Sequence, residues 1–268
     1  MAILTYNGQP LNFGLSDQPF YTQPNNWSFI SSGEHVWHDL DGHCFYSYGS
    51  TNKMFDGTNW SDVTVSGVSS VYGYGIWTDG SNVYYSYGST QQYYVQYSEG
   101  VLTFTPKAWN GFTDFYGSDV WSDGTNIYIS YLSDQYVLNK ATSTWNSKTW
   151  QGYSQPMGMM IWTDGIDFYY NRYVLNKSTS TWTEKTWYGY QNINGQNVWS
   201  DGDNTYMSIS GGHFMLDTAT STWTQIYPGV NFTGAKVWHN NGISYVSGEY
   251  IIVNHDPSQY NFISYETT

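Results

Sequence analysis

A short pattern, a β-branched residue followed by tryptophan, recurs six times along this chain. Each copy continues into a turn rich in Asp, Gly and Asn, and then into an alternating, strand-like segment such as Ile127–Tyr131. A repeat of about 40 residues with several strand patterns is typical of the blades of a β-propeller. The repeat therefore predicts one all-β domain, where a length of 268 residues alone suggests two. Successive tryptophans are 37 to 44 residues apart: Trp37, Trp77, Trp121, Trp162, Trp199 and Trp238.

A second hairpin follows the first in each repeat. It is clearest where the chain reads QYVLNKATSTWNSKTW (residues 135–150), RYVLNKSTSTWTEKTW (172–187) and HFMLDTATSTWTQIY (213–227). The Asp-Gly and Asn residues between the strand patterns tolerate the positive φ angles of tight turns. The repeat therefore predicts four strands per blade, which we call A to D from the axis outward. The first two repeats depart from this pattern in their second half.

The last repeat lacks a D strand of the Ser-Thr-Trp type. Tyr250–Val253 fits a C strand, whereas residues 25–30, before the first Val-Trp pair, resemble a displaced D strand. Pairing of the two ends of the chain would close the ring and cover open sheet edges. We therefore predict an all-β, six-bladed propeller over residues 23–254, with four antiparallel strands per blade and the last blade closed by an N-terminal strand. Residues 1–22 form an arm and residues 255–268 a tail.

The order of strand, Asp-Gly turn, tyrosine-containing strand and Ser-Thr-Trp segment resembles the kelch-type β-propeller repeat over about residues 25–254. The opening segment ILTYNG (residues 3–8) resembles the start of many tailed-phage structural proteins. This second resemblance implies a virion accessory protein of a tail, fibre or capsid surface, assembled in the host cytoplasm. It also implies that residues 1–22 dock onto a virion partner.

Composition excludes several other classes. With 8 basic and 21 acidic residues, the formal net charge of −13 would repel a phosphate backbone, so no nucleic-acid partner is expected. The first residues lack a basic segment followed by an apolar one, and no stretch reaches the roughly 20 apolar residues of a membrane span. We therefore expect neither standard export nor membrane insertion. The single Cys44 excludes an intrachain disulfide and a thiolate-rich metal site.

Two enzyme classes built on propellers do not fit the sequence. Sialidases clamp a carboxylate with several arginines, and this chain has only Arg172. Copper radical oxidases need a cysteine-linked tyrosine, but Cys44 falls at the strand position of Val83 and Ile127, which indicates a small buried side chain. We therefore expect a noncatalytic protein without a cofactor.

The repeated aspartates and scattered histidines allow two interpretations. A ring of carboxylates at the A–B turns could bind calcium or act as acid and base, but an identical residue in four blades fits a turn former better. Asp203 adds a second carboxylate beside the last of them, and His38 and His239 could approach each other in a closed ring, without a third ligand. We predict turn formers and no metal site. The repeated aspartates are Asp79, Asp123, Asp164 and Asp201.

The loops that join one blade to the next differ in length and residue type, whereas the A–B and C–D turns are nearly uniform. Because a binding site must break the repeat, we place it on the face formed by the D–A and B–C loops. Tyrosines beside Asn, Gln and Ser suit sugars, whose apolar ring faces stack on aromatic rings. The alternative is that these aromatic residues cap the core beneath each loop. The predicted ligand-binding residues are Phe112, Tyr153, Tyr190, Tyr87, Tyr131 and Arg172.

The leading hypothesis is a noncatalytic binding or assembly module of a virion that contacts a virion protein or a host-surface glycan. A free carbohydrate-binding lectin, cytoplasmic or released by an unrecognised route, is the alternative. A hydrolase or lyase that uses carboxylates in the central channel is a third hypothesis, for which the sequence names no residue pair.

Overall fold

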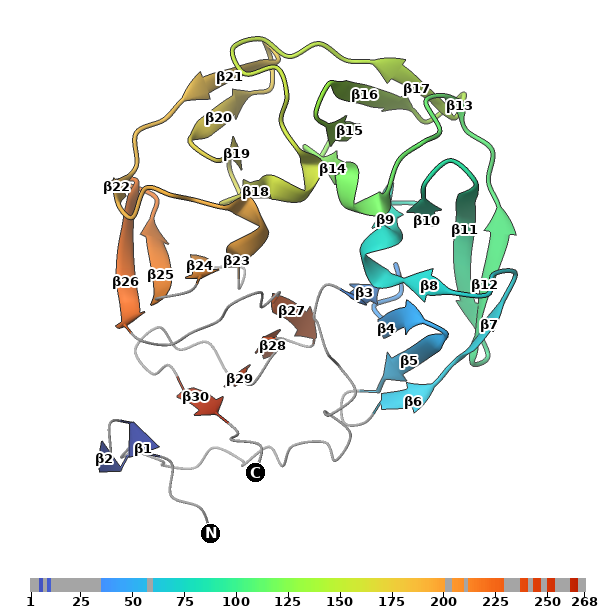
Figure 1. Ribbon diagram of the computed structural model, residues 1–268, viewed down its shortest axis with the longest axis horizontal. Coiled ribbons are helices and arrows are strands. Elements are labelled where there is room, and N and C mark those ends of the chain that lie inside the picture. Colours follow the sequence, from blue (N-terminus) through green and yellow to red (C-terminus); the bar gives the residue numbers. More distant parts are fainter. Residues whose placement is uncertain are drawn as a thin grey trace.

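The computed structural model describes residues 5–6, 9–10, 35–56, 60–200, 204–209, 212–228, 237–240, 243–246, 250–253 and 261–264. Within these ranges the regular structure consists of β-strands and short 3-10 turns (η), without an α-helix. Strands run outward from a central axis as the blades of a β-propeller (Figure 1). The predicted all-β propeller class is confirmed.

Five blades lie between Val36 and Pro228, and in each of them four antiparallel strands follow one another in A-B-C-D order. Blade 1 contains β3 (Val36–His38), β4 (Cys44–Gly49), β5 (Thr51–Phe55) and β6 (Trp60–Asp62), and blade 2 contains β9 (Ile76–Thr78), β10 (Val83–Tyr87), β11 (Gln91–Ser98) and β12 (Val101–Pro106). Blade 3 contains β14 (Val120–Ser122), β15 (Ile127–Tyr131), β16 (Asp134–Asn139) and β17 (Thr144–Ser147). Blade 4 contains β18 (Ile161–Thr163), β19 (Phe168–Tyr170), β20 (Tyr173–Asn176) and β21 (Thr181–Glu184), and blade 5 contains β23 (Val198–Ser200), β24 (Thr205–Ile209), β25 (Gly212–Asp217) and β26 (Thr222–Pro228).

The C-terminal strands form a further four-stranded antiparallel sheet in the order β27 (Val237–Asn240), β28 (Ile243–Val246), β29 (Tyr250–Val253) and β30 (Asn261–Ser264). Its fourth strand was predicted to come from the N-terminus, and this prediction is wrong. β30, from the predicted tail, pairs with β29 through Ile251 and Ile263. Pairing two strands joined by a short loop costs less chain entropy than recruiting the opposite end of the chain. Residues 25–30 lie outside the described residues.

The predicted N-terminal arm contains a small hairpin. β1 (Thr5–Tyr6) pairs antiparallel with β2 (Gln9–Pro10), with Tyr6 opposite Gln9. The two residues between the strands are Asn-Gly, a sequence that favours the tightest hairpin connections.

Tryptophan triads fill the boundaries between successive blades from blade 2 to blade 5. Each triad combines the A-strand tryptophan of one blade, the tryptophan after its D strand, and the D-strand tryptophan of the next blade. Between blades 2 and 3 the ring centroids of Trp77, Trp109 and Trp145 are 5.5 to 5.9 Å apart, and all three rings are buried. Aromatic pairs at these distances add to the stabilisation that apolar burial provides. The other triads are Trp121, Trp150 and Trp182, and Trp162, Trp187 and Trp223.

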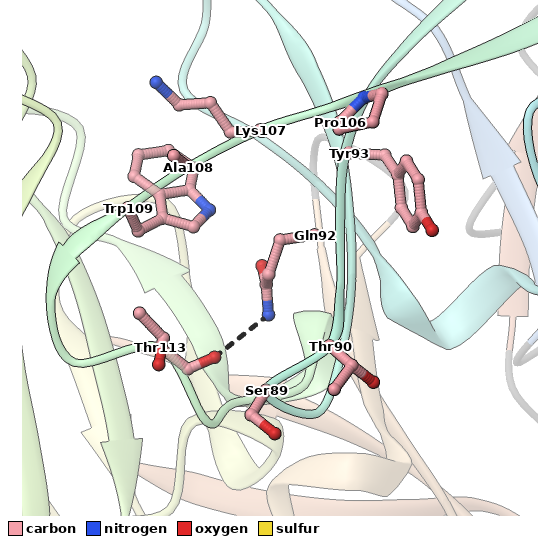
Figure 2. Close-up of a pocket in the computed structure, with 9 residues that line it drawn as sticks. All are labelled: Ser89, Thr90, Gln92, Tyr93, Pro106, Lys107, Ala108, Trp109 and Thr113. Carbon is pink, nitrogen blue, oxygen red and sulfur yellow. Dashed lines mark hydrogen bonds between the residues drawn. The ribbon is translucent and has the colours of Figure 1, made fainter.

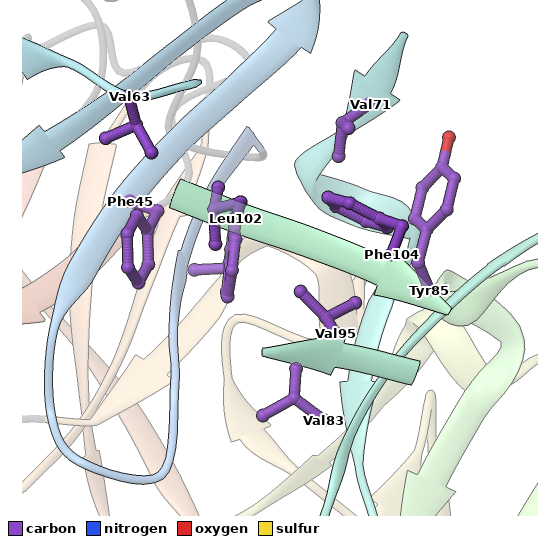
Figure 3. Close-up of a cluster of buried hydrophobic side chains, with 9 residues drawn as sticks. Phe45, Val63, Val71, Val83, Tyr85, Val95, Leu102 and Phe104 are labelled. Atoms are coloured by element: carbon purple, nitrogen blue, oxygen red, sulfur yellow. The ribbon is translucent and has the colours of Figure 1, made fainter. Parts of the chain in front are cut away.

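The boundary between blades 1 and 2 is packed differently, in keeping with the divergent second half of these repeats. In blade 2 the D strand β12 carries Leu102 and Phe104 where later blades carry a tryptophan. These side chains pack with Phe45 of blade 1 and Val95 of blade 2 in one buried cluster (Figure 3). Smaller residues thus replace a triad here.

The segments that link blades add a fifth strand that the sequence analysis missed. β7 (Thr64–Ser66), β13 (Asn110–Gly111) and β22 (Tyr188–Gly189) each pair in parallel with the D strand of the following blade. Gly111 has a φ of 79°, and a Cβ there would lie 2.3 Å from the carbonyl oxygen of Trp145. Gly152 and Gly189 approach the next D strand in the same way. Each link therefore covers an otherwise open sheet edge, and only glycine fits at its closest point.

We predict that Gly111→Ala destabilises the fold much more than Gly124→Ala. Both glycines have positive φ angles, but a Cβ at Gly124 would meet nothing within 4 Å. Gly124→Ala should therefore cost only the backbone strain of about 1 kcal/mol. Gly111→Ala should cost at least about 2 kcal/mol more, because the strand and its neighbour must separate. Urea unfolding midpoints of the two variants measure the difference, and equal losses would contradict an inter-blade role for Gly111.

Candidate functional site

The B–C turns and the D–A links meet on one face of the propeller, as the sequence analysis expected. Gly88 in the β10–β11 turn donates its N–H to the carbonyl oxygen of Phe115 at 3.0 Å, and Tyr87 forms an isolated bridge with Tyr116. The side-chain amide of Gln92 donates to the carbonyl oxygen of Thr113 at 3.2 Å. We call this face the loop face.

A 3-10 turn precedes the A strand of each of blades 2 to 5. In η4 (Gly117–Asp119), a Cβ at Gly117 would lie 2.1 Å from the carbonyl oxygen of Gly75, in the preceding turn η3 (Gly73–Gly75). The turns therefore contact one another around the axis, and this contact requires glycine. The corresponding sequence signal, a glycine four residues before each of the six repeat tryptophans, was missed in the sequence analysis. The remaining turns are η5 (Gly158–Met160) and η6 (Gly195–Asn197).

Five tyrosines gather beside these turns at blades 1, 2 and 3, and we call them the tyrosine cluster: Tyr48, Tyr72, Tyr74, Tyr87 and Tyr116. The rings of Tyr72 and Tyr87 are stacked, with centroids 5.2 Å apart. Tyr48 stands edge-on to Tyr72 at 5.7 Å, and Tyr116 stands edge-on to Tyr87 at 5.1 Å. Tyr48 is 51% exposed and Tyr116 is 42% exposed, so the cluster offers both ring faces and ring edges to solvent.

The cluster rests on a buried histidine, and one of its tyrosines, Tyr74, has a raised pKa. The ring of His35, 4% exposed, lies 4.7 Å from that of Tyr48 and 5.5 Å from that of Tyr74. Burial, and then a hydrogen bond with Tyr87, hold the pKa of Tyr74 above its usual range. At neutral pH the Tyr74 hydroxyl is therefore uncharged.

Asp119 lies in the turn η4, next to the cluster. Its carboxylate accepts the backbone N–H of Tyr116 at 3.3 Å. Burial raises the pKa of Asp119 to about 6, although that hydrogen bond lowers it in part. Asp119 thus helps to position the segment that carries Tyr116.

The tyrosine cluster is not repeated around the propeller. Tyr72 and Tyr116 each precede the glycine of a 3-10 turn, and at the same position later links carry Met157 and Asn194. Blade 4 also has a shorter B–C turn, in which Tyr170 pairs with Tyr173. The scaffold is therefore repeated, whereas this group of tyrosines belongs to one side of the ring.

Two of the six predicted ligand-binding residues, Tyr87 and Tyr131, lie at the end of a B strand, directly before the B–C turn. Tyr87 is a member of the cluster. Tyr131 occupies the matching end of β15 in blade 3 and is 45% exposed. Arg172 pairs instead with Glu184, with its Nε 3.2 Å from Oε1, and both side chains are more than half exposed.

The other three predicted ligand-binding residues pack against the following blade. Phe112 stacks on Tyr136 with centroids 4.3 Å apart and planes 9° from parallel. In the same way, Tyr153 contacts Tyr173 at 4.8 Å and Tyr190 contacts Phe214 at 4.7 Å. These contacts match the alternative interpretation, in which the aromatic residue caps the core, and a ligand-binding role for the three stays a prediction.

The repeated aspartates act as turn formers. Asp123 Oδ1 accepts the backbone N–H groups of Thr125 and Asn126 at 2.9 and 2.7 Å, and its Oδ2 accepts the hydroxyl of Tyr128 at 3.0 Å. Asp79 and Asp164 make the equivalent hydrogen bonds. Asp201 and Asp203 lie outside the described residues.

One acidic group with a histidine could in principle hold a metal. Ligand atoms of Asp39, Asp41 and His43 lie within 4.8 Å of one another in the first turn of blade 1. However, Asp39 already accepts the backbone N–H groups of Asp41 and His43, and its Oδ2 lies 2.7 Å from His43 Nδ1. This group is therefore explained as a turn.

Cys44 is 1% exposed, and burial raises the pKa of its thiol to about 12. This matches the prediction of a small buried side chain.

We predict that Asp123→Asn weakens the acid sensitivity of the fold. Burial alone would raise the pKa of Asp123, but the N–H groups of Asn126 and Thr125 and the Tyr128 hydroxyl lower it below its usual range. A lowered pKa stabilises the folded state above the unfolded pKa, and this stabilisation is lost as pH falls through the folded pKa. Urea midpoints measured from about pH 5 down to about pH 2 should therefore fall less steeply in Asp123→Asn. Asp114→Asn, at an exposed position, is the matched control, and an unchanged slope in Asp123→Asn would refute the assignment.

Within the described residues, no helix is long and apolar enough to cross a membrane. No family model matches the sequence, and no curated protein matches it.

Solved structures show the likeness that the sequence comparisons lack. The extracellular domain of BT3049 from B. thetaiotaomicron, described as a hybrid two component system, is 13% identical, with a TM-score of 0.53 over 92% of this chain and 36% of that one. The extracellular domain of BT4673 from the same organism, described likewise, is 12% identical, with a TM-score of 0.56 over 89% of this chain and 34% of that one. This chain thus spans about a third of the structures that it matches. The likeness shows a shared propeller fold.

Proposed function

We propose that this chain is a noncatalytic recognition module whose tyrosine cluster binds neutral carbohydrate on the loop face. The observation that carries the proposal is the cluster itself: five tyrosines gathered from segments far apart in the sequence, with Tyr72 and Tyr116 at the position where later links carry Met157 and Asn194. Sugars present apolar ring faces that stack on aromatic rings, and hydroxyls that exchange hydrogen bonds with phenols.

Charge favours a neutral ligand over an anionic one. The formal net charge of −13 repels anionic polymers. The hydroxyl of Tyr74 in the cluster is uncharged at neutral pH and can exchange hydrogen bonds with a sugar hydroxyl. Binding by this surface should therefore change little with salt concentration.

The proposal includes a six-bladed ring, with β27–β30 as the sixth blade. This sheet has the A-B-C-D order of the others and begins with the sixth Val-Trp pair, Val237 and Trp238. It lies between the blades that contain β23–β26 and β3–β6 (Figure 1). Sequential hairpins without an exchanged N-terminal strand would complete the ring.

The proposed biological setting is a virion accessory protein, with residues 1–22 as the docking arm. The phage-like opening segment and the hairpin β1–β2 in this arm support it. The structural neighbours are described as extracellular domains of two component systems, which fits recognition outside a cell equally well. Deleting residues 1–22 should abolish attachment to a larger assembly and leave the propeller folded; unchanged attachment would exclude the docking role.

We predict that Tyr116→Ala and Tyr48→Ala each weaken glycan binding about tenfold, because each removes one exposed aromatic wall. The measurement is binding of the purified chain to an array of bacterial surface polysaccharides, followed by titration with the best ligand. Tyr188→Ala is the matched control, since Tyr188 is 58% exposed and lies in β22, away from the cluster.

Absence of glycan binding by the unaltered chain would exclude the carbohydrate proposal and favour a protein partner. Binding that Tyr116→Ala and Tyr48→Ala both leave unchanged would show that carbohydrate binds elsewhere on the propeller.

A further inference from the structure

A pocket of about 390 Å³ lies on the outer side of the β10–β11 turn. It is lined by that turn and the start of β11, by the end of β12, and by the link that leads to blade 3 (Figure 2). Tyr87 of the tyrosine cluster is the last residue of β10, and Ser89 of the pocket follows it by two residues in the β10–β11 turn. The pocket and the cluster are therefore neighbours on the loop face.

Trp109 forms one wall of the pocket and carries a hydrogen-bond donor that nothing satisfies. The side chain is 8% exposed, and its buried Nε1 has no partner among the described residues. Figure 2 shows this nitrogen on the side of the ring that faces Gln92 and Tyr93. A buried donor without a partner is costly, so it favours a ligand that brings an acceptor.

The equivalent tryptophan at the next blade boundary is satisfied within the protein. Trp150 Nε1 donates to Gln135 Oε1 at 2.9 Å. In blade 2 the corresponding Gln92 Oε1 accepts the hydroxyl of Ser86 at 2.6 Å, and Gln92 Nε2 donates to backbone carbonyls. Gln92 thus bonds to Ser86 and to the backbone, and the Trp109 indole N–H has no partner among the described residues.

Other buried indole N–H groups also lack a partner, but only Trp109 lines the pocket described here. They include Trp187, which is the equivalent of Trp109 two boundaries further on, and the D-strand tryptophans Trp145, Trp182 and Trp223, whose neighbours in the triads are aromatic rings. The combination of an unsatisfied donor and space for an acceptor therefore singles out Trp109.

The other pocket groups define the ligand class. Tyr93, Pro106 and Ala108 offer apolar surface, and Ser89 and Thr90 offer hydroxyls at the exposed rim. Lys107 donates to Ser143 Oγ at 2.6 Å and lies 4.6 Å from the centre of the Trp109 ring, so its ammonium is directed to the next blade and to that ring. The Trp109 indole N–H is a neutral donor beside these groups.

We propose that this pocket binds an acetamido sugar residue, whose carbonyl oxygen accepts the Trp109 indole N–H and whose methyl group packs against the apolar walls. An acetamido group places an acceptor and a methyl side by side, as this arrangement requires. The inference deepens the proposed function and rests on it in one respect, because one saccharide chain would contact the pocket and the tyrosine cluster together.

The test follows the indole N–H resonances of ¹⁵N-labelled protein during titration with N-acetylglucosamine, with glucose in parallel. Trp109→Phe and Trp150→Phe assign the two resonances. We expect a saturable downfield shift of the Trp109 signal with N-acetylglucosamine, a shift at least about fivefold weaker in apparent affinity with glucose, and no shift of Trp150. Ala108→Trp, which fills the pocket from an exposed position, should abolish the shift.

Matched variants separate the pocket from the packing role of Trp109. Trp109→Phe and Trp150→Phe remove equivalent members of two triads, so only the first should weaken N-acetylglucosamine binding. An unmoved Trp109 signal, or equal affinity in the Ala108→Trp variant, would overturn the inference. Polysaccharide binding that is lost in Tyr116→Ala but kept in Ala108→Trp would overturn the pocket alone and leave the proposed function standing. A Trp109 shift without polysaccharide binding at the cluster would support the pocket and overturn the proposed function of the cluster.

Discussion

Close backbone contact between successive blades is the constraint on which the rest of this structure depends. Near the axis, Gly117 lies against the carbonyl oxygen of Gly75, and near the rim Gly111 lies against that of Trp145. Between these two contacts the tryptophan triads fill the boundary with buried rings. Few charged groups are available, since charged residues make up 11% of the chain. Shape and aromatic packing therefore fix the position of each blade, and a methyl group at either glycine would push neighbouring blades apart.

This arrangement separates the residues that hold the fold from those that can vary. Turn aspartates such as Asp123 and the glycines of the links are repeated because every blade needs the same turn and the same contact. The residue before each 3-10 turn differs from link to link. It is Tyr72 or Tyr116 on one side of the ring and Met157 or Asn194 on the other. A binding surface can therefore arise at these positions at little cost to the propeller.

The same distinction explains what the sequence could predict. The Val-Trp strands, the Asp turns and the all-β propeller class follow from a repeated pattern, because repetition reports packing. The fifth strands could not be predicted, since a two-residue pairing such as β13 has no periodicity of its own. The last strand of the C-terminal sheet, β30, was missed because it carries no Ser-Thr-Trp segment, and strand pairing followed proximity in the chain. Phe112, Tyr153 and Tyr190 were predicted as binding residues because their motif is conspicuous; their rings pack on the following blade, and a binding role for them stays a prediction.

Departures from the repeat in hydrogen bonding are as informative as departures in residue type. In blades 1, 2 and 3 the A-strand tryptophan donates to a buried serine, as Trp77 does to Ser86 at 2.8 Å. The bonds of the neighbouring glutamine differ between the two blades: Gln92 Oε1 accepts the hydroxyl of Ser86, whereas Gln135 Oε1 accepts the indole N–H of Trp150. Two nearly identical sequences thus leave one indole donor satisfied and the other facing a pocket. Along the repeat, Trp150 is satisfied by Gln135, whereas Trp109 and its other equivalent, Trp187, have no partner among the described residues, and of these two Trp109 lines the pocket described above.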